Sequence, residues 1–116
     1  MDHRMGLFEE PFHSMKMGEK TVEGRLNDEK RRKVKIGDFI TFIRLPENGH
    51  ALVAAVTELR IFPTFREMYE HIPASDFDAV GDSIEEMVTN TYELYTPEQE
   101  KAWGTSAITL KLVKEE

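Results

Sequence analysis

Hydrophobic and polar positions repeat with a period of two in several parts of the chain. Between residues 20 and 26, Val22 and Leu26 fall on one side of an extended segment, and Thr21, Glu23 and Arg25 fall on the other. The segment 39–45 is apolar at almost every position, as in a strand packed on both faces. An Asn-Gly hairpin then leads into a long return strand over 51–62, and 107–113 alternates again. These patterns predict four strands.

Helical spacing appears in four other places. Acids, Pro11 and a terminating Gly18 predict a short helix over 9–17. Three further helices are predicted to begin at Thr64, Ser83 and Thr96, each followed three residues later by Glu or Gln as in a capping box. The order of elements favours an α+β fold with a mostly antiparallel, curved sheet. With few strands available, we expect a small open β-barrel with helices packed around it, because closure protects the sheet edges.

Length and composition limit the classes of protein. The 116 residues suit a single domain spanning 1–116. The chain has no Cys, and none of its four His lies three to five residues from another, so neither a metal site nor a cofactor is predicted. No apolar run approaches the roughly 20 residues that cross a bilayer, and the N-terminus lacks a signal-peptide core. We therefore expect no membrane partner and a cytoplasmic location.

The net charge of −7 conceals an uneven distribution. Residues 16–35 hold eight Lys and Arg against four acids, a net of +4, whereas the rest of the chain carries −11. An acidic total argues against coating duplex DNA, which requires many cations. The basic segment is therefore either a solvated loop beside an acidic surface or a local positive site for an anionic or electron-rich ligand.

The candidate chemistry lies within Gly18-Glu19-Lys20-Thr21-Val22-Glu23-Gly24-Arg25. Strand spacing places Thr21, Glu23 and Arg25 on one face, with Lys20 at the start of the strand. Such a cluster is either a surface ion-pair ladder or a recognition site in which Arg supplies paired donors and Glu accepts from an amine. No glycine-rich phosphate loop and no Gly-x-Ser-x-Gly elbow is present, so common nucleotidase and serine hydrolase sites are disfavoured.

Three motifs together resemble the ASCH family, named for homology to the activating signal cointegrator. They are Gly18-x-Lys20-Thr21-x-Glu23-x-Arg25, Ile36-Gly37-Asp38-x-Ile40-x-Phe42, and Tyr95-Thr96-x-Glu98-x-Glu100-x-x-Trp103-Gly104. The resemblance implies a PUA-like β-barrel whose cleft is lined by the first motif. It also implies RNA binding.

Some bacterial ASCH proteins are amidohydrolases of N4-acetylcytidine, with a Lys-Thr-x-Thr-x-Arg pattern, and others have been proposed as ribonucleases. Lys20, Thr21 and Arg25 match that pattern, but Glu23 stands in place of the nucleophilic threonine. The downstream catalytic glutamate would fall near Val80. Catalysis, with Lys20 and Glu23 as the candidate residues, is therefore left open.

The sequence thus predicts recognition of RNA or of a modified nucleoside or nucleotide by Lys20, Thr21, Glu23 and Arg25. Unpaired base edges would provide the specificity. The basic residues Arg31 and Arg32 are the candidate phosphate contacts. The alternatives are a small amidohydrolase or weak ribonuclease, and a protein-interaction module that uses the acidic helical face. Aromatic residues on helical stripes, such as Tyr95, are expected to pack in the core. Nothing in the sequence fixes an oligomeric state.

Overall fold

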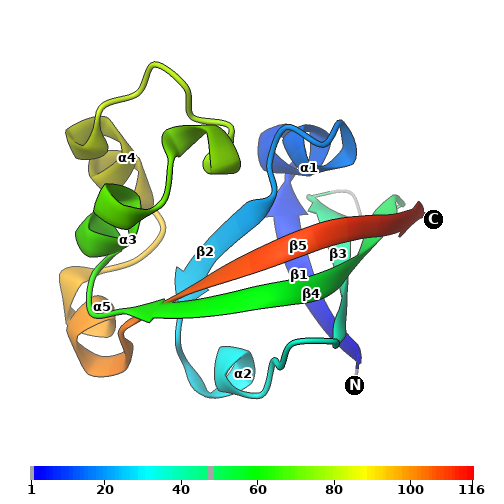
Figure 1. Cartoon of the computed structure of the whole chain (residues 1–116), viewed down its shortest axis with the longest axis horizontal. Coiled ribbons are helices and arrows are strands. Elements are labelled where there is room, and N and C mark those ends of the chain that lie inside the picture. The colour runs from blue at the N-terminus through cyan, green and yellow to red at the C-terminus, as the bar shows by residue number, and fades with distance from the viewer. Residues whose placement is uncertain (1, 47–48) are drawn as a thin grey trace.

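Five strands form one curled sheet, with helices on its flanks (Figure 1). The computed structural model describes residues 2–46 and 49–116. The sheet has the order β1-β3-β4-β5-β2, so β1 and β2 are its two edges. The strands are β1 (Asp2–Phe8), β2 (Val22–Leu26), β3 (Phe39–Leu45), β4 (Ala51–Phe62) and β5 (Thr105–Glu115). The helices are α1 (Glu9–Lys16), α2 (Glu29–Arg32), α3 (Phe65–His71), α4 (Ile84–Thr91) and α5 (Pro97–Trp103), with a 3-10 turn η1 (Ala74–Phe77).

The long β4 organises the sheet because it pairs with β3 on one side and β5 on the other. These two pairings and the β2–β5 pairing are antiparallel, whereas β1 runs parallel to β3. Irregularities in the β4–β5 register at Val53/Ala54 and Val56/Glu58 are the kind that increase strand twist and bend. The sheet curls into a half-barrel whose edges, β1 and β2, are not paired with each other. The predicted α+β class and the mostly antiparallel, open barrel are confirmed.

Two parts of the sequence prediction need correction. The first strand was not predicted, although Met5 and Leu7 are buried and alternate with exposed or half-exposed neighbours. No helix was predicted within residues 27–33, but Asp28 caps the short helix α2 by accepting a hydrogen bond from the Arg31 amide. The predicted Asn48-Gly49 hairpin turn lies partly outside the described residues.

The side chains of the sheet enter two hydrophobic clusters because successive residues of a strand point to opposite faces. One cluster fills the half-barrel and includes Ile40, Phe42 and Leu52, together with α1 residues. The other lies between β2 and α3, where Val22 and Leu26 pack against Phe65, Met68, Ile72 and Ala107. Helix α3 therefore packs against the face of β2 that carries Val22 and Leu26.

Helices α3, α4 and α5 form a group beside β2 (Figure 1). Reciprocal capping boxes at Ser83 and Thr96 begin α4 and α5, as predicted. The box predicted at Thr64 is present as its first half, in which the Thr64 side chain accepts a hydrogen bond from the Glu67 amide and caps α3. The buried Glu100 carboxylate joins the group by accepting hydrogen bonds from the Phe65 amide at 2.8 Å and the Tyr92 hydroxyl at 2.7 Å. Among the described residues, no helix is both long and apolar enough to span a membrane.

Candidate ligand-binding site

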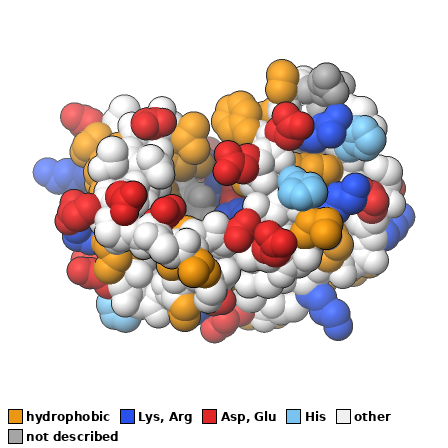
Figure 2. All heavy atoms as spheres, turned by 90° about the horizontal axis from the view of Figure 1, so that it is seen from above, with side chains coloured by type: hydrophobic (Ala, Val, Ile, Leu, Met, Phe, Trp, Pro, Cys, Tyr) orange, Lys and Arg blue, Asp and Glu red, His pale blue; other side chains and the backbone are white. Residues whose placement is uncertain are grey.

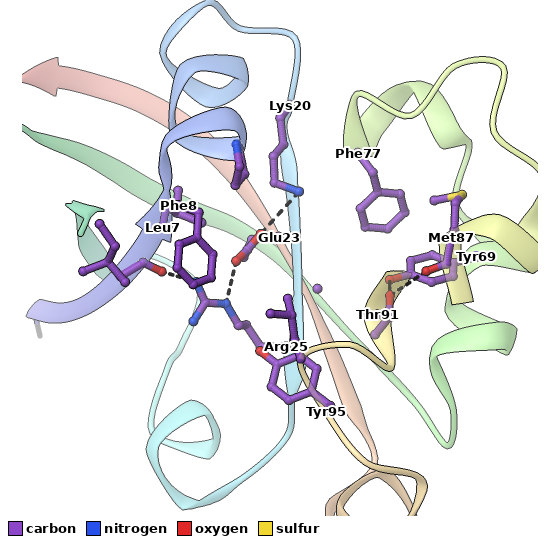
Figure 3. A pocket seen from close by; sticks show the side chains of 15 residues that line it. Leu7, Phe8, Lys20, Glu23, Arg25, Tyr69, Phe77, Met87, Thr91 and Tyr95 are labelled. Atoms are coloured by element: carbon purple, nitrogen blue, oxygen red, sulfur yellow. Dashed lines mark hydrogen bonds and ion pairs between the residues drawn. The ribbon is translucent and has the colours of Figure 1, made fainter. Parts of the chain in front are cut away.

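A cavity of about 470 Å³ lies between the open edges of the half-barrel and the helical group (Figure 3). Strand β1 and helix α1 contribute one side, β2 contributes the charged wall, and α3, η1 and α4 contribute the other side. The volume falls within the range of about 300–1,000 Å³ that is usual for small-molecule sites. The lining residues are Gly6, Leu7, Phe8, Pro11, Lys20, Glu23, Gly24, Arg25, Leu45, Tyr69, Phe77, Met87, Thr91, Leu94 and Tyr95.

Glu23 is at the centre of the charged wall. Its side chain is only 9% exposed, and each carboxylate oxygen meets a different cation. Lys20 Nζ lies 3.3 Å from Oε1, and Arg25 Nε donates to Oε2 at 2.5 Å. The strand period brings Glu23 and Arg25 to the same face, and the residues just before β2 place Lys20 above them. The three charged residues predicted from the sequence are thus in direct contact.

Arg25 also spans the gap between the two edges of the sheet. Its Nη2 group donates to the Gly6 carbonyl of β1 at 2.7 Å. Within the described sheet, no backbone hydrogen bonds pair β1 with β2, so the guanidinium is what connects these two edges. It can do so because its several N–H donors can reach a carboxylate and a carbonyl at the same time. Burial and pairing fix this side chain at the cavity wall.

Burial and charge act in opposite directions on the Glu23 carboxyl. Burial by itself raises the pKa of Glu23, but the positive charges of Lys20 and Arg25 and their hydrogen bonds outweigh this effect and hold it below its usual value. Burial likewise opposes the charged form of Arg25, whereas Glu23 raises the pKa of the guanidinium. The wall therefore presents an ionised carboxylate between two cations at neutral pH.

Aromatic side chains form the opposite wall. Phe77 lies edge-on to Tyr69, with ring centroids 5.3 Å apart, and Lys20 Nζ is 5.5 Å from the Phe77 centroid. The Tyr69 hydroxyl pairs with Thr91 Oγ1 at 2.6 Å. The Thr91 hydroxyl in turn donates to the Met87 carbonyl at 2.8 Å. Burial raises the pKa of Tyr69 to about 12, so the phenol is neutral. This wall is largely apolar and its polar groups are mutually satisfied.

Thr21 and the basic residues of α2 are not among the residues that line the cavity. The Thr21 side chain is exposed, and its backbone is held by Asp76 and Leu110. Arg31 pairs with Asp28 at 3.1 Å. Arg32 donates to the Asn27 carbonyl and lies over the Trp103 ring, 5.2 Å from its centroid. The positive segment 16–35 is therefore divided between the cavity wall and α2, which lies beyond the opposite end of β2.

A second hollow, more acidic, adjoins the cavity and shares Phe8 and Leu45 with it. Four carboxylate residues line it, namely Glu9, Glu10, Glu19 and Asp78. Viewed from above, the molecule is hollowed between its two halves, and acidic side chains gather around the hollow (Figure 2). No described group of three or more His, Cys, Asp and Glu side chains is arranged to hold a metal ion.

The fold and site define an α+β protein with an open, half-barrel sheet and, at its seam, a cavity that has a charged wall and an aromatic wall. The family model for the ASCH domain matches residues 5–114. The chain therefore belongs to the ASCH domain family, a PUA-like family for which RNA binding has been proposed. This confirms the resemblance found in the sequence motifs. No protein in a search of curated proteins matches the chain.

Solved structures agree with this assignment. The crystal structure of hypothetical protein PH0355 is 37% identical, with a TM-score of 0.87 over 97% of this chain and 100% of that one. The solution NMR structure of protein PF0455 from Pyrococcus furiosus is 36% identical, with a TM-score of 0.78 over 98% and 99%. ASCH from Zymomonas mobilis shares only the fold, at 12% identity and a TM-score of 0.61 over 93% and 65%.

Sequence reasoning missed most of the aromatic wall. Phe77 lies on the unpredicted turn η1, and Tyr95, which was expected in the core, follows α4 and also lines the cavity. Phe8 ends the unpredicted β1 and is 56% exposed at the cavity. The alternation of buried Met5 and Leu7 would have located Phe8 as the last residue of a strand. Nothing local in the sequence would have directed Phe77 toward Lys20.

Proposed function

We propose that the cavity binds a nucleobase, presented by a nucleoside, a nucleotide or an unpaired residue of RNA. The observation that carries this proposal is the buried, ionised Glu23 between Lys20 and Arg25, opposite an aromatic wall. An ionised carboxylate only accepts hydrogen bonds, so it selects ligand groups that donate, such as exocyclic amines. Lys20 retains donors for a neighbouring carbonyl or ring nitrogen.

The shape and composition of the cavity support the same ligand class. Its volume suits a small molecule, and Tyr69, Phe77 and Tyr95 offer apolar surface for a flat ring. Phe8 and Leu94 are 56% and 63% exposed and line the cavity, so bound ligand would cover apolar surface that is now in water. Unpaired bases are commonly bound by aromatic surfaces together with hydrogen bonds to their edges.

Several features favour binding over hydrolysis. Glu23 has a lowered pKa, and a carboxylate that holds its proton so weakly is a poor general base near neutral pH. Thr21 does not line the cavity, and the proton of Thr91 is committed to the Met87 carbonyl. Among the described lining residues, no hydroxyl has an activating base of the kind that nucleophilic catalysis requires.

Titration of the protein with cytidine, guanosine, adenosine and uridine tests the proposal. By isothermal calorimetry or NMR, we expect a nucleoside with an exocyclic amine to bind more tightly than uridine, which has none. Replacing Glu23 by Gln keeps the side-chain shape but turns half of the acceptor into a donor. This change should lower the affinity for that nucleoside at least tenfold, because hydrogen bonds to a charged group contribute about 1.5–3 kcal/mol.

The matched control is Glu58→Gln, on the exposed part of β4 and outside the cavity lining. Its affinity for each nucleoside should equal that of the unchanged protein. Absence of binding by all four nucleosides, or equal binding by the Glu23→Gln and unchanged proteins, would contradict the proposal. A spectrophotometric assay with N4-acetylcytidine tests the hydrolase alternative directly, and turnover abolished by Lys20→Ala would replace binding with catalysis.

A further inference from the structure

The two ends of the charged wall face surroundings of opposite charge. Lys20 precedes β2, and the acidic hollow adjoins the cavity at this end through Phe8 and Leu45. Arg25 lies toward the other end of β2, where the chain continues into α2. A ligand that carries a charge on one side of its base would therefore have a preferred orientation.

Helix α2 concentrates cations beyond the Arg25 end. Residues 28–33 hold four cations against two carboxylates. Asp28 lies only three residues after Arg25, near the end of β2. Arg31 Nη1 donates to Asp28 Oδ2 at 3.1 Å, which holds the Arg31 guanidinium close to that end of the strand. Within the described part of the chain, neither Nη2 of Arg31 nor the ammonium of Lys30 has a hydrogen-bond partner or forms an ion pair. These donors are available to an anion.

Electrostatic effects connect α2 with the cavity. Burial raises the pKa of Tyr95. The positive charges of Arg25 and Arg31 oppose that rise, and the negative charges of Glu23 and Asp28 add to it, so residues of α2 and of its cap act on a residue that lines the cavity. Partial burial lowers the pKa of Lys30, and the charges of Arg31 and Arg25 lower it further. Asp28 opposes this effect, but the charges of Arg25 and Arg31 both reach Lys30, so these three cations lie near one another at the Arg25 end of the cavity. An anion at this end would be attracted by all three.

The acidic hollow has the opposite effect at the Lys20 end. Glu9, Glu10, Glu19 and Asp78 line it, and no Lys or Arg is among its described lining residues. All four are exposed to solvent, and a phosphate placed here would meet like charges on every side of the hollow that they line. A strand that continued past the cavity in this direction would be disfavoured.

We propose that the cavity takes a nucleotide with a phosphate on one side only, directed toward α2 and bound by Arg31 and Lys30. This inference rests on the nucleobase site proposed above. Two ligands present these same groups, namely a free mononucleotide and the terminal residue of a single strand. A nucleotide inside a strand is disfavoured because its second phosphate would face the acidic hollow.

Calorimetric titration with four forms of one base tests the inference. The base is the one whose nucleoside binds most tightly, and the forms are the nucleoside, the 5′-monophosphate, the 3′-monophosphate and the 3′,5′-bisphosphate. One monophosphate should bind about threefold to tenfold more tightly than the nucleoside, as expected for a partly exposed ion pair. The bisphosphate should bind less tightly than that monophosphate. The gain should shrink as salt is raised.

Variants locate the phosphate. Arg31→Gln and Lys30→Gln should each reduce the gain without changing nucleoside affinity, whereas Lys114→Gln, a charge-matched change near the end of β5, should leave the gain intact. If Arg31→Gln does not fold, the loss of the gain in Lys30→Gln alone tests the inference, because Lys30 is exposed. A dinucleoside monophosphate joined through the preferred oxygen separates the two sources. Binding equal to the mononucleotide indicates a strand terminus, and weaker binding indicates a free mononucleotide.

Several outcomes would overturn the inference while leaving the base site intact. They are nucleoside binding with no gain from either monophosphate, a bisphosphate that binds most tightly, and a gain unaffected by both α2 variants. A gain that grows in Glu19→Gln but persists in Arg31→Gln would place the phosphate at the acidic end instead. Failure of every nucleoside to bind would overturn the base site itself, so the two failures are distinguishable.

Discussion

Glu23 and Arg25 show how two residues combine recognition and structure. Glu23 is ionised in a buried position because Lys20 and Arg25 each approach one of its oxygens. Arg25 in addition reaches the Gly6 carbonyl across the open seam of the sheet. Lysine could not replace it, since a single ammonium lacks the planar set of donors that serves both partners.

Replacing Arg25 by Met should lower the free energy of unfolding by about 3 kcal/mol. Breaking a buried ion pair from one side leaves the other charge incompletely compensated, which costs about 3–5 kcal/mol, and Lys20 offsets part of the loss here. Urea unfolding measures the change. The control is Arg66→Met, which breaks the exposed pair with Glu85 and should cost far less, because solvent screens an exposed ion pair. Equal losses in the two variants would contradict a structural role for Arg25.

At the scale of elements, the helical group depends on one buried side chain of α5. Glu100 accepts from the first residue of α3 and from Tyr92, just after α4. The site depends on this arrangement because α3 and α4 supply Tyr69, Met87 and Thr91 to the cavity. The capping boxes make the helices predictable one by one, but they do not indicate which residue joins them.

Replacing Glu100 by Ala should cost about 2 kcal/mol of stability, because the buried Phe65 amide and the Tyr92 hydroxyl lose their acceptor. Thermal unfolding followed by circular dichroism provides the measurement. Glu98→Ala, on the exposed face of the same helix, should change stability by no more than about 0.5 kcal/mol. A neutral effect of Glu100→Ala would mean that other contacts join the helices.

At the scale of the whole molecule, the acidic total and the paired carboxylates determine how the protein responds to acid. The His3 side chain contacts Asp38 Oδ2 at 2.8 Å, and the Lys35 amide donates to the same oxygen at 2.9 Å. These contacts lower the pKa of Asp38 from 3.8 to about 2. They also connect β1 to the turn that begins β3, so acid acts on one edge of the half-barrel.

Stability should therefore be constant near neutral pH and fall in acid. A carboxyl group with a lowered pKa in the folded state stabilises the fold fully above its unfolded pKa, and this contribution is lost as pH falls toward the folded value. For Asp38 that window runs from 3.8 down to about 2, and Glu23 begins to lose its contribution near 4.5. Urea unfolding between pH 6 and 2.5 should show the decline, and Asp38→Asn should flatten it. If Asp38→Asn leaves the slope of unfolding free energy against pH unchanged, the His3–Asp38 pair does not contribute to the loss of stability in acid.

The sequence alone determined the local structure and the identity of the charged cluster. Alternation along β2 placed Glu23 and Arg25 on one face, and the capping residues located α3, α4 and α5. Both follow from local geometry, since strand period and helix capping depend on residues only a few positions apart. The motifs also led to the correct family over residues 5–114.

Only the tertiary structure decided what surrounds that cluster. The aromatic wall combines Tyr69, Phe77 and Tyr95 from three separate segments, and Gly6 of β1 meets Arg25 across 19 positions of sequence. The basic segment appeared as one unit in the sequence, but folding divides it between the cavity and α2. The physical reason is that contacts between distant segments depend on how the sheet curls and how the helices pack against it, and the local pattern of residues does not encode either.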